Sequence, residues 1–521
     1  MMDQSETKSE PTTEFTFDRK KIIANLMDLI PKMKELREKS KEIISTVKKP
    51  ELQVLAPDSK VIENDLRKIC SVPHRRIGTE EAHEIENYLE NTFKELGLEN
   101  VKKETFEVIN WVATDWKLSI ELNDEVIEIP CFYVLNTEFT DKKGIRAPLI
   151  YVGTGSKKDF KKIDVNGKIV VADIEFPTFP VGKIIKMAEP YYVSDPQNSF
   201  DENTETILTF VLSNFLPQAL GGKPREDTVY WRAVRGGALG LILILRDAPT
   251  NINTQWGPYD GMMKPVPALY VGKYDGMKVR ELAQIENSQA TLILNGYKEI
   301  SKANNIWGIL PGQSEEMFMI STHTDSAFEG ASEDGTGVAM VLAQLRAWSN
   351  IPKEKRPKSL LFVLTAGHLY GGIGAELFAK KYRDNLLKKV IVDINLEHLC
   401  AKEVEEDPET HNYRFTNNLA IGAVFLSHDE HLVAFTIKAF KEHKIERMLL
   451  IPENFFNTPP IGEAGHFTTH SDLKVIHWIR NPYYLLTSED TLDKIAIDKL
   501  QPTAQCVTDL INSLMDLPKK N

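Results

Sequence analysis

One stretch, from Met317 to Gly337, combines residue types that can bind a divalent metal ion. An apolar run of strand length comes first, then His323 and Asp325, then a glycine-rich turn with Glu333 and Asp334, and then a helical pattern. An imidazole at a strand end can supply a nitrogen ligand, a turn carboxylate can supply oxygen, and Asp325 can fix the tautomer of His323. The stretch also fits an ordinary α/β loop in which Asp334 caps the helix.

Two further predicted strands end in residues of the same kind. The strand 359–365 is followed by His368, and the strand 390–396 is followed by Glu397 and His398. Because the carboxyl ends of parallel strands share one edge of a sheet, these groups can converge with those of the first stretch. Two divalent ions that share a carboxylate would polarise a carbonyl group and lower the pKa of a bridging water.

The remaining histidines offer few ligand candidates. Those interpreted as surface or loop residues are His74, His83, His411, His428, His431, His443 and His477. His466 and His470 lie four positions apart, shortly before a predicted strand.

Composition narrows the class of protein. The chain has 521 residues, 42% of them hydrophobic, and a net charge of −12, which argues against nucleic acid as the main partner. The four cysteines are widely spread, so neither a disulfide scaffold nor a cysteine zinc knuckle is supported. The polar N-terminus has no signal-peptide core, and no apolar run reaches the length of a membrane span. We therefore expect a cytoplasmic protein without a membrane segment, either a monomer or a homo-oligomer.

The pattern of elements predicts an α/β domain that is interrupted by a β-rich insert. The expected divisions are a disordered tail (1–17), a helical segment (18–57) interrupted at Pro31, the first part of the α/β domain (58–120), the insert (121–300) and the second part of the α/β domain (301–521). Within the insert, the irregular stretch 177–228 could be a lid over a substrate or an insertion without a role. Arg75 and Arg76 could bind an anion or form salt bridges in a surface turn.

The order of these elements resembles the zinc-dependent aminopeptidase and glutamate carboxypeptidase family, which are two-zinc exopeptidases related to glutaminyl cyclases. The resemblance spans about residues 58 to 515. PHRRIGTEE resembles the proline–arginine–glycine turn of the family, and NPYYLLTSEDTLDKI resembles its C-terminal Tyr-His-Thr-x-x-Asp-Thr segment. VNGKIVVADI, RAVRGGALGLILIL and PVPALYV resemble a protease-associated domain. The resemblance implies a three-layer, mixed-sheet α/β domain with an inserted protease-associated domain.

The resemblance also implies zinc ligands. His323 matches the first zinc-binding histidine, and Asp325 matches the aspartate that supports it. Glu333 stands at the metal-bridging aspartate, and Glu397 stands at a further aspartate ligand. These replacements keep metal-binding side chains.

Other positions depart from the family pattern. Gly367 and His368 stand where the family has two glutamates, a general base and then a ligand, and Leu486 stands at the last histidine ligand. The base is therefore absent, and one ligand is lost. His466 could replace the lost ligand and Glu463 the base.

Two functions remain open from the sequence. In the favoured one, the chain is a metal-dependent hydrolase that holds one or two zinc ions and cleaves an amide bond of a peptide or an acylated amino acid. In the other, the chain is a pseudoenzyme that binds peptides or partner proteins, and His466 and His470 are a helix-start pair without a ligand role. A glutaminyl-cyclase-like transfer also fits the fold, but no residue selects it.

Overall fold

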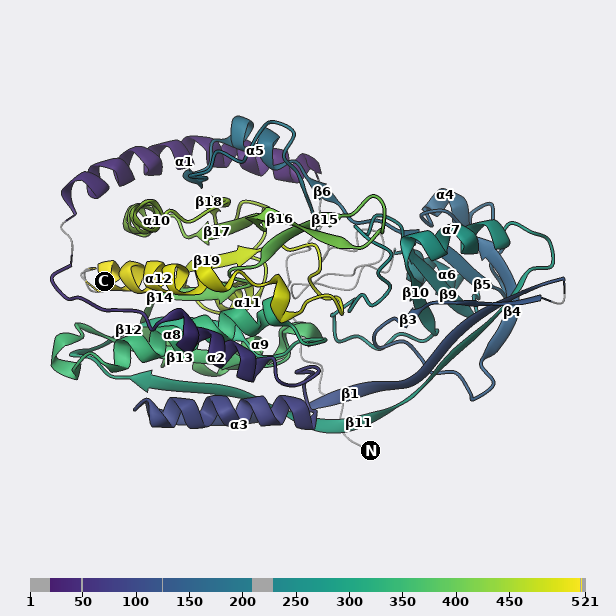
Figure 1. Cartoon of the computed structure of the whole chain (residues 1–521), viewed down its shortest axis with the longest axis horizontal. Coiled ribbons are helices and arrows are strands. Elements are labelled where there is room, and N and C mark those ends of the chain that lie inside the picture. Colours follow the sequence, from purple (N-terminus) through teal and green to yellow (C-terminus); the bar gives the residue numbers. More distant parts are fainter. Residues whose placement is uncertain (1–18, 48–49, 124, 209–227, 516, 518–521) are drawn as a thin grey trace.

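A mixed β-sheet forms the middle layer of the larger part of the molecule (Figure 1). The computed structural model describes residues 19–47, 50–123, 125–208, 228–515 and 517. At the centre of the sheet lie three parallel neighbours, β13 (Lys358–Thr365), β12 (Ser314–His323) and β14 (Val390–Glu397). Every residue of β13 and β14 is buried, as expected for parallel strands that are covered by helices on both faces.

The sheet continues on both sides of this centre. Beyond β14 follow β19 (Lys474–Arg480), β17 (Gly422–Leu426), β18 (Met448–Pro452) and β7 (Tyr192–Ser194). On the other side, β11 (Gln289–Leu310) pairs antiparallel with β13 and with the long strand β1 (Glu99–Leu122). The smaller sheets are β15 (Lys402–Glu406) with β16 (Tyr413–Leu419), and β6 (Thr178–Phe179) with β8 (Thr206–Ile207).

Helices cover both faces of the sheet and complete three layers. Alternation along β12 directs Phe318 and Ile320 into the core shared with α8 (Thr336–Ser349), while Met317 and Met319 enter the core on the opposite face. Other helices of the first face are α2 (Ser59–Ile69), α3 (Glu80–Glu95), α10 (Glu430–His443) and α12 (Leu500–Leu514). Those of the opposite face are α9 (Ile373–Tyr382) and α11 (Glu463–His470). The predicted three-layer α/β fold with a mixed sheet is therefore confirmed.

The first helix packs on the outside of these layers. Helix α1 (Arg19–Thr46) runs beside α10 (Figure 1) and buries Leu26, Leu29 and Met33. The interruption predicted at Pro31 is wrong, because the helix continues through this residue while its apolar face stays packed. Helix α3 (Glu80–Glu95) lies against β1 and β11. None of the helices in the described ranges is long and apolar enough to cross a membrane.

The insert forms the smaller part of the molecule, and β1 and β11 run from one part to the other (Figure 1). Its strands are β2 (Glu125–Ile129), β3 (Phe132–Tyr133), β4 (Ile145–Tyr151), β5 (Ile169–Ile174), β9 (Gly240–Leu245) and β10 (Ala268–Val271). Its helices are α4 (Lys157–Phe160), α6 (Val229–Arg235) and α7 (Lys273–Leu282). Its identity as a protease-associated domain stays a prediction.

The expected domain boundaries do not coincide with ends of strands. Positions 120 and 300 fall inside β1 and β11, so two continuous strands join the parts. Helix α5 (Val181–Ala188) and strand β7 pack on the larger part, although they lie within the expected insert. The expected tail 1–17 lies outside the described residues, and so do residues 209–227 of the expected lid.

Candidate metal centre

The parallel strands bring four predicted ligands to one edge of the sheet. His323 ends β12, Glu397 ends β14, His368 begins the turn after β13, and Glu333 lies in the loop after β12. Glu333 Oε1 lies 3.6 Å from His323 Nε2 and 3.9 Å from His368 Nε2. The rings of His323 and His368 are stacked, with centroids 4.1 Å apart. The convergence predicted from the strand ends is therefore observed.

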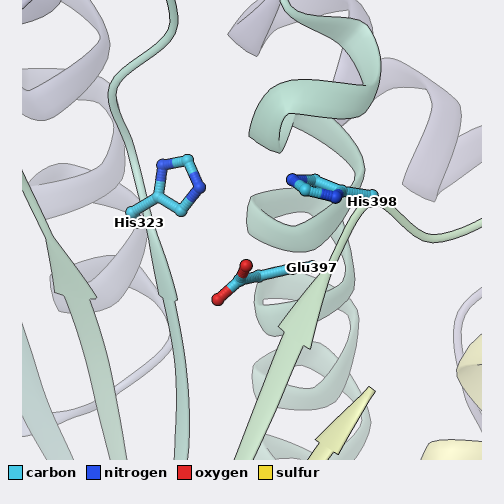
Figure 2. A group of neighbouring side chains, drawn as sticks. All are labelled: His323, Glu397 and His398. Atoms are coloured by element: carbon cyan, nitrogen blue, oxygen red, sulfur yellow. The ribbon is translucent and has the colours of Figure 1, made fainter. Parts of the chain in front are cut away.

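His398 is a donor at this edge that sequence reasoning did not select as a ligand. It follows Glu397 directly, and its Nε2 lies 2.8 Å from Glu333 Oε2. In the described chain, possible ligand atoms gather within 4.8 Å of one another in two groups: His323, Glu397 and His398, and His323, Glu333 and His368. The side chains of the first group converge from the ends of two neighbouring strands (Figure 2).

Three imidazoles are oriented through Nδ1. The Nδ1 of His323 lies 3.1 Å from the main-chain oxygen of Asp325, and the Nδ1 of His398 lies 2.9 Å from that of Arg480. The Nδ1 of His368 lies 3.1 Å from Oε1 of Glu463. An Nδ1–H that donates to these oxygens leaves Nε2 as the nitrogen that could bind a metal ion.

Asp325 supports the site in a different way from the one predicted. Its carboxylate is 3.7 Å from Nδ1 of His323 and accepts hydrogen bonds from the main-chain N–H groups of Gly367, His368 and Leu369 at 2.9 to 3.0 Å. Asp325 therefore holds the turn that carries His368, while its main-chain oxygen orients His323.

A buried arginine fixes the loop before α8. Arg75 donates to the main-chain oxygens of Thr324, Glu329, Gly330 and Glu333 at 2.6 to 3.1 Å. Its guanidinium is therefore occupied by the protein, which removes the basis for anion binding at Arg75.

The same loop is anchored from the C-terminal segment. Asp490 accepts hydrogen bonds from the N–H groups of Ser332 and Glu333, both at 2.8 Å. Only the resemblance of the segment around Asp490 to the family pattern could have indicated this role.

Asp334 links the helix start to His398. It accepts hydrogen bonds from Gly337 N–H in the first turn of α8, at 3.3 Å, and from His398 N–H, at 2.9 Å. Asp334 therefore bonds to the first turn of α8, although the N-cap position itself is Gly335. Burial raises the pKa of Asp334 to about 7.

Helix α11 brings Glu463 to the cluster. The Glu463 N–H donates to Glu397 Oε1 at 3.0 Å, and its carboxylate faces His368. His466 lies on the same helix, but its Nε2 packs against Gly372, where an added Cβ would be only 1.9 Å away. His466 belongs to neither group of donors.

Two positions named in the sequence analysis, His477 and Leu486, are buried in the structure. His477 lies on β19 with no exposed surface, and its Nε2 is 3.5 Å from Glu397 Oε1, so its interpretation as a surface or loop residue is wrong. The apolar run around it was the available signal. Leu486 is buried in an apolar cluster, and its main-chain oxygen accepts a hydrogen bond from Trp256 N–H at 2.8 Å.

A loop of the insert contacts the site from outside. The ring of Tyr259 lies nearly parallel to that of His368, with centroids 5.7 Å apart. Thr254 Oγ1 lies 2.6 Å from Ser488 Oγ. The His323 side chain is fully buried, whereas that of His368 is 13% exposed. Among the donors, His368 is therefore the one that reaches solvent.

The buried carboxylates raise the pKa values of two histidines in the cluster. Burial alone would lower the pKa of His368, but Glu463, Glu333 and Glu397 outweigh it and raise that pKa to about 10. Burial would likewise lower the pKa of His398, but the charge of Glu333 outweighs it and raises that pKa to about 9. A divalent cation could satisfy the same carboxylates and displace the protons.

The donor atoms fit a zinc-type ion. His323 Nε2, Glu333 Oε1, Glu397 Oε2 and His398 Nε2 are buried and make no hydrogen bond in the described chain. Buried polar atoms without partners are rare, so this group needs a partner of another kind. Imidazole nitrogens and carboxylate oxygens are common zinc ligands.

Comparisons with known proteins find a family match and a shared fold. Residues 305–441 match Peptidase family M28. A zinc aminopeptidase from Bacillus subtilis is similar at 16% identity and a TM-score of 0.60, over 88% of this chain and 95% of that one. A peptidase M28 precursor from Shewanella amazonensis is similar at 16% identity and 0.61, over 94% and 99%. An aminopeptidase from Aneurinibacillus sp. strain AM-1 is similar at 18% identity and 0.57, over 87% and 93%. No curated protein matches significantly.

These findings define the fold of the protein. The chain has the α/β fold of these aminopeptidases, and its polar cluster lies at the carboxyl edge of the central strands. Its segment 305–441 matches the Peptidase family M28, so the resemblance predicted from the sequence motifs is confirmed.

Proposed function

We propose that this protein is a metal-dependent hydrolase of the exopeptidase type, which cleaves an amide bond in a peptide or an acylated amino acid. The observation that carries the proposal is the buried group of unpaired donors around His323, Glu333, Glu397 and His398. When bound there, a zinc ion would polarise the substrate carbonyl and activate a water molecule.

The residues of the chain would divide the remaining tasks. His323 and the surrounding carboxylates would hold the ion, and Asp325 would keep the turn of His368 in place. The pair of His368 and Glu463 would move a proton, because Glu463 Oε1 fixes Nδ1 and leaves Nε2 facing the cluster. This pair lies beside Gly367, where the family pattern has its general base.

The test combines metal content with a peptidase assay. The full chain, loaded with one equivalent of zinc, is incubated with a panel of aminoacyl, peptidyl and N-acyl amino acid amides. We expect hydrolysis that a chelator abolishes and that His368→Asn reduces strongly. A zinc-loaded protein that hydrolyses none of these classes contradicts the proposed reaction.

A non-catalytic role is the second candidate, and a specific observation favours it. Gly367 has no side chain to act as a base, and Leu486 is buried in an apolar cluster rather than offering a ligand. In that case the protein would bind peptides or partner proteins without cleaving them. Peptide binding without turnover by the zinc-loaded chain would support this candidate.

A further inference from the structure

We infer that His398 is a metal ligand and that the protein holds a single ion, bound by His323, Glu397 and His398 with Glu333 beside them. The inference rests on the proposed function, because it assumes that the cluster binds a metal ion. It differs from the ligand set that the sequence suggests, in which His368 and His466 bind metal and His398 does not.

The first argument is the shared nitrogen of His323. Both groups of donors include His323, and its Nδ1 is directed at the main-chain oxygen of Asp325, so only Nε2 is free for a metal. An imidazole nitrogen has one lone pair and binds one ion. The two groups therefore compete for one ion, and they do not describe two complete sites.

The second argument is the state of the donor atoms. In the group with His398, each residue has a buried atom without a hydrogen-bond partner among the described residues: His323 Nε2, Glu397 Oε2 and His398 Nε2. These residues also end two neighbouring parallel strands, which is a rigid support for a site. The competing group depends on His368, which is partly exposed and lies on a turn.

The third argument is the contact between His398 and Glu333. His398 Nε2 lies 2.8 Å from Glu333 Oε2, yet this contact does not have hydrogen-bond geometry. With Nδ1–H directed at the main-chain oxygen of Arg480, Nε2 faces a carboxylate oxygen at contact distance. A cation must join these two atoms, either a proton or a metal ion, and two ligand atoms of one zinc ion lie about 3 Å apart.

The backbone explains how His398 reaches the ion. Adjacent residues of a strand point to opposite faces, which would direct Glu397 and His398 apart. His398 has a φ of +57°, so the chain leaves the strand in the left-handed region and turns the imidazole back toward the cluster. The N–H of His398 is held in this position by Asp334.

The experiment compares matched substitutions in the full chain. His398→Asn and His368→Asn make the same change, and asparagine tolerates the positive φ of position 398. After metal removal with a chelator, zinc stoichiometry and affinity are measured by competition with a chromophoric chelator. We expect one ion per wild-type chain, a loss of affinity of more than about 100-fold in His398→Asn, and less than about 10-fold in His368→Asn.

The opposite pattern would overturn the inference: wild-type affinity in His398→Asn with a large loss in His368→Asn, or two ions of similar affinity per chain. A wild-type chain that binds no zinc would instead refute the proposed function on which the inference rests. If His398→Asn does not fold, crystals of the wild-type protein grown with zinc provide the second measurement. Anomalous scattering should place the ion about 2.0–2.1 Å from His398 Nε2, and an ion bonded to His368 instead would refute the inference.

Discussion

Glu463 Oε1 lies 3.1 Å from Nδ1 of His368, so the first residue of α11 is joined to the turn after β13. The carboxylate of Asp325 holds the same turn by accepting hydrogen bonds from the main-chain N–H groups of His368 and Leu369. His368 is therefore fixed from two sides, while its Nε2 faces the cluster and its side chain is partly exposed. This arrangement suits a residue that exchanges a proton with a substrate.

Glu463→Gln should reduce hydrolysis about 10- to 100-fold, because glutamine keeps the size of the side chain but removes the charge that holds His368 Nδ1–H. The measurement is kcat/KM of the zinc-loaded protein, with zinc stoichiometry as a parallel readout that should not change. Glu376→Gln on α9 is the control, since this carboxylate pairs with the exposed Lys380. Full activity of Glu463→Gln would contradict this role.

Asp325→Asn should destabilise the protein by about 1–3 kcal/mol, because an amide cannot accept hydrogen bonds from all three N–H groups that Asp325 now binds. Urea unfolding measures the change in the free energy of unfolding. Asp384→Asn, at an exposed position, is the matched control and should change it by less than about 0.5 kcal/mol. Equal stabilities of the two variants would disprove the assigned role of Asp325.

Arg75→Ala should lower the free energy of unfolding by at least about 3 kcal/mol, because several buried main-chain oxygens lose a charged donor. Zinc affinity should fall as well, since the same oxygens shape the loop of Glu333. Arg67→Ala is the control, because Arg67 forms an exposed ion pair with Glu63 within one helix, and such pairs contribute little. The prediction fails if both variants unfold at the same urea concentration.

Zinc should stabilise the folded chain against heat. At a free zinc concentration of about 100 times the dissociation constant, the expected gain is about 2.7 kcal/mol. Magnesium should give little stabilisation at the same concentration, because it prefers oxygen ligands and the cluster offers imidazoles. Unfolding curves that coincide with zinc and with chelator would argue against a metal centre.

Part of the site was predictable because strand ends are visible in a sequence. His323, His368 and Glu397 each follow an apolar run, and parallel pairing brings the ends of those runs together. His398 was placed at this edge from the sequence but was not selected as a ligand, because its orientation depends on a left-handed backbone conformation at that one residue. The alternation rule for strands would place its side chain on the other face.

The fold was predictable to a similar extent. Periodic apolar patterns identified the central strands and the helices that cover them. The pairing of β7 with β18 was not foreseen, because a three-residue strand leaves almost no pattern. The course of β1 and β11 through both parts of the molecule was also missed, since residues 297–300 in the middle of β11 are exposed and interrupt its apolar pattern.

The most direct test of the metal centre is a zinc titration of the metal-free full chain beside His323→Ala, because His323 belongs to both groups of donors. We predict one tightly bound zinc ion per wild-type chain and none in a folded His323→Ala chain. A folded wild-type protein that binds no zinc, or a His323→Ala variant that binds zinc as tightly as the wild type, would contradict the metal centre described here.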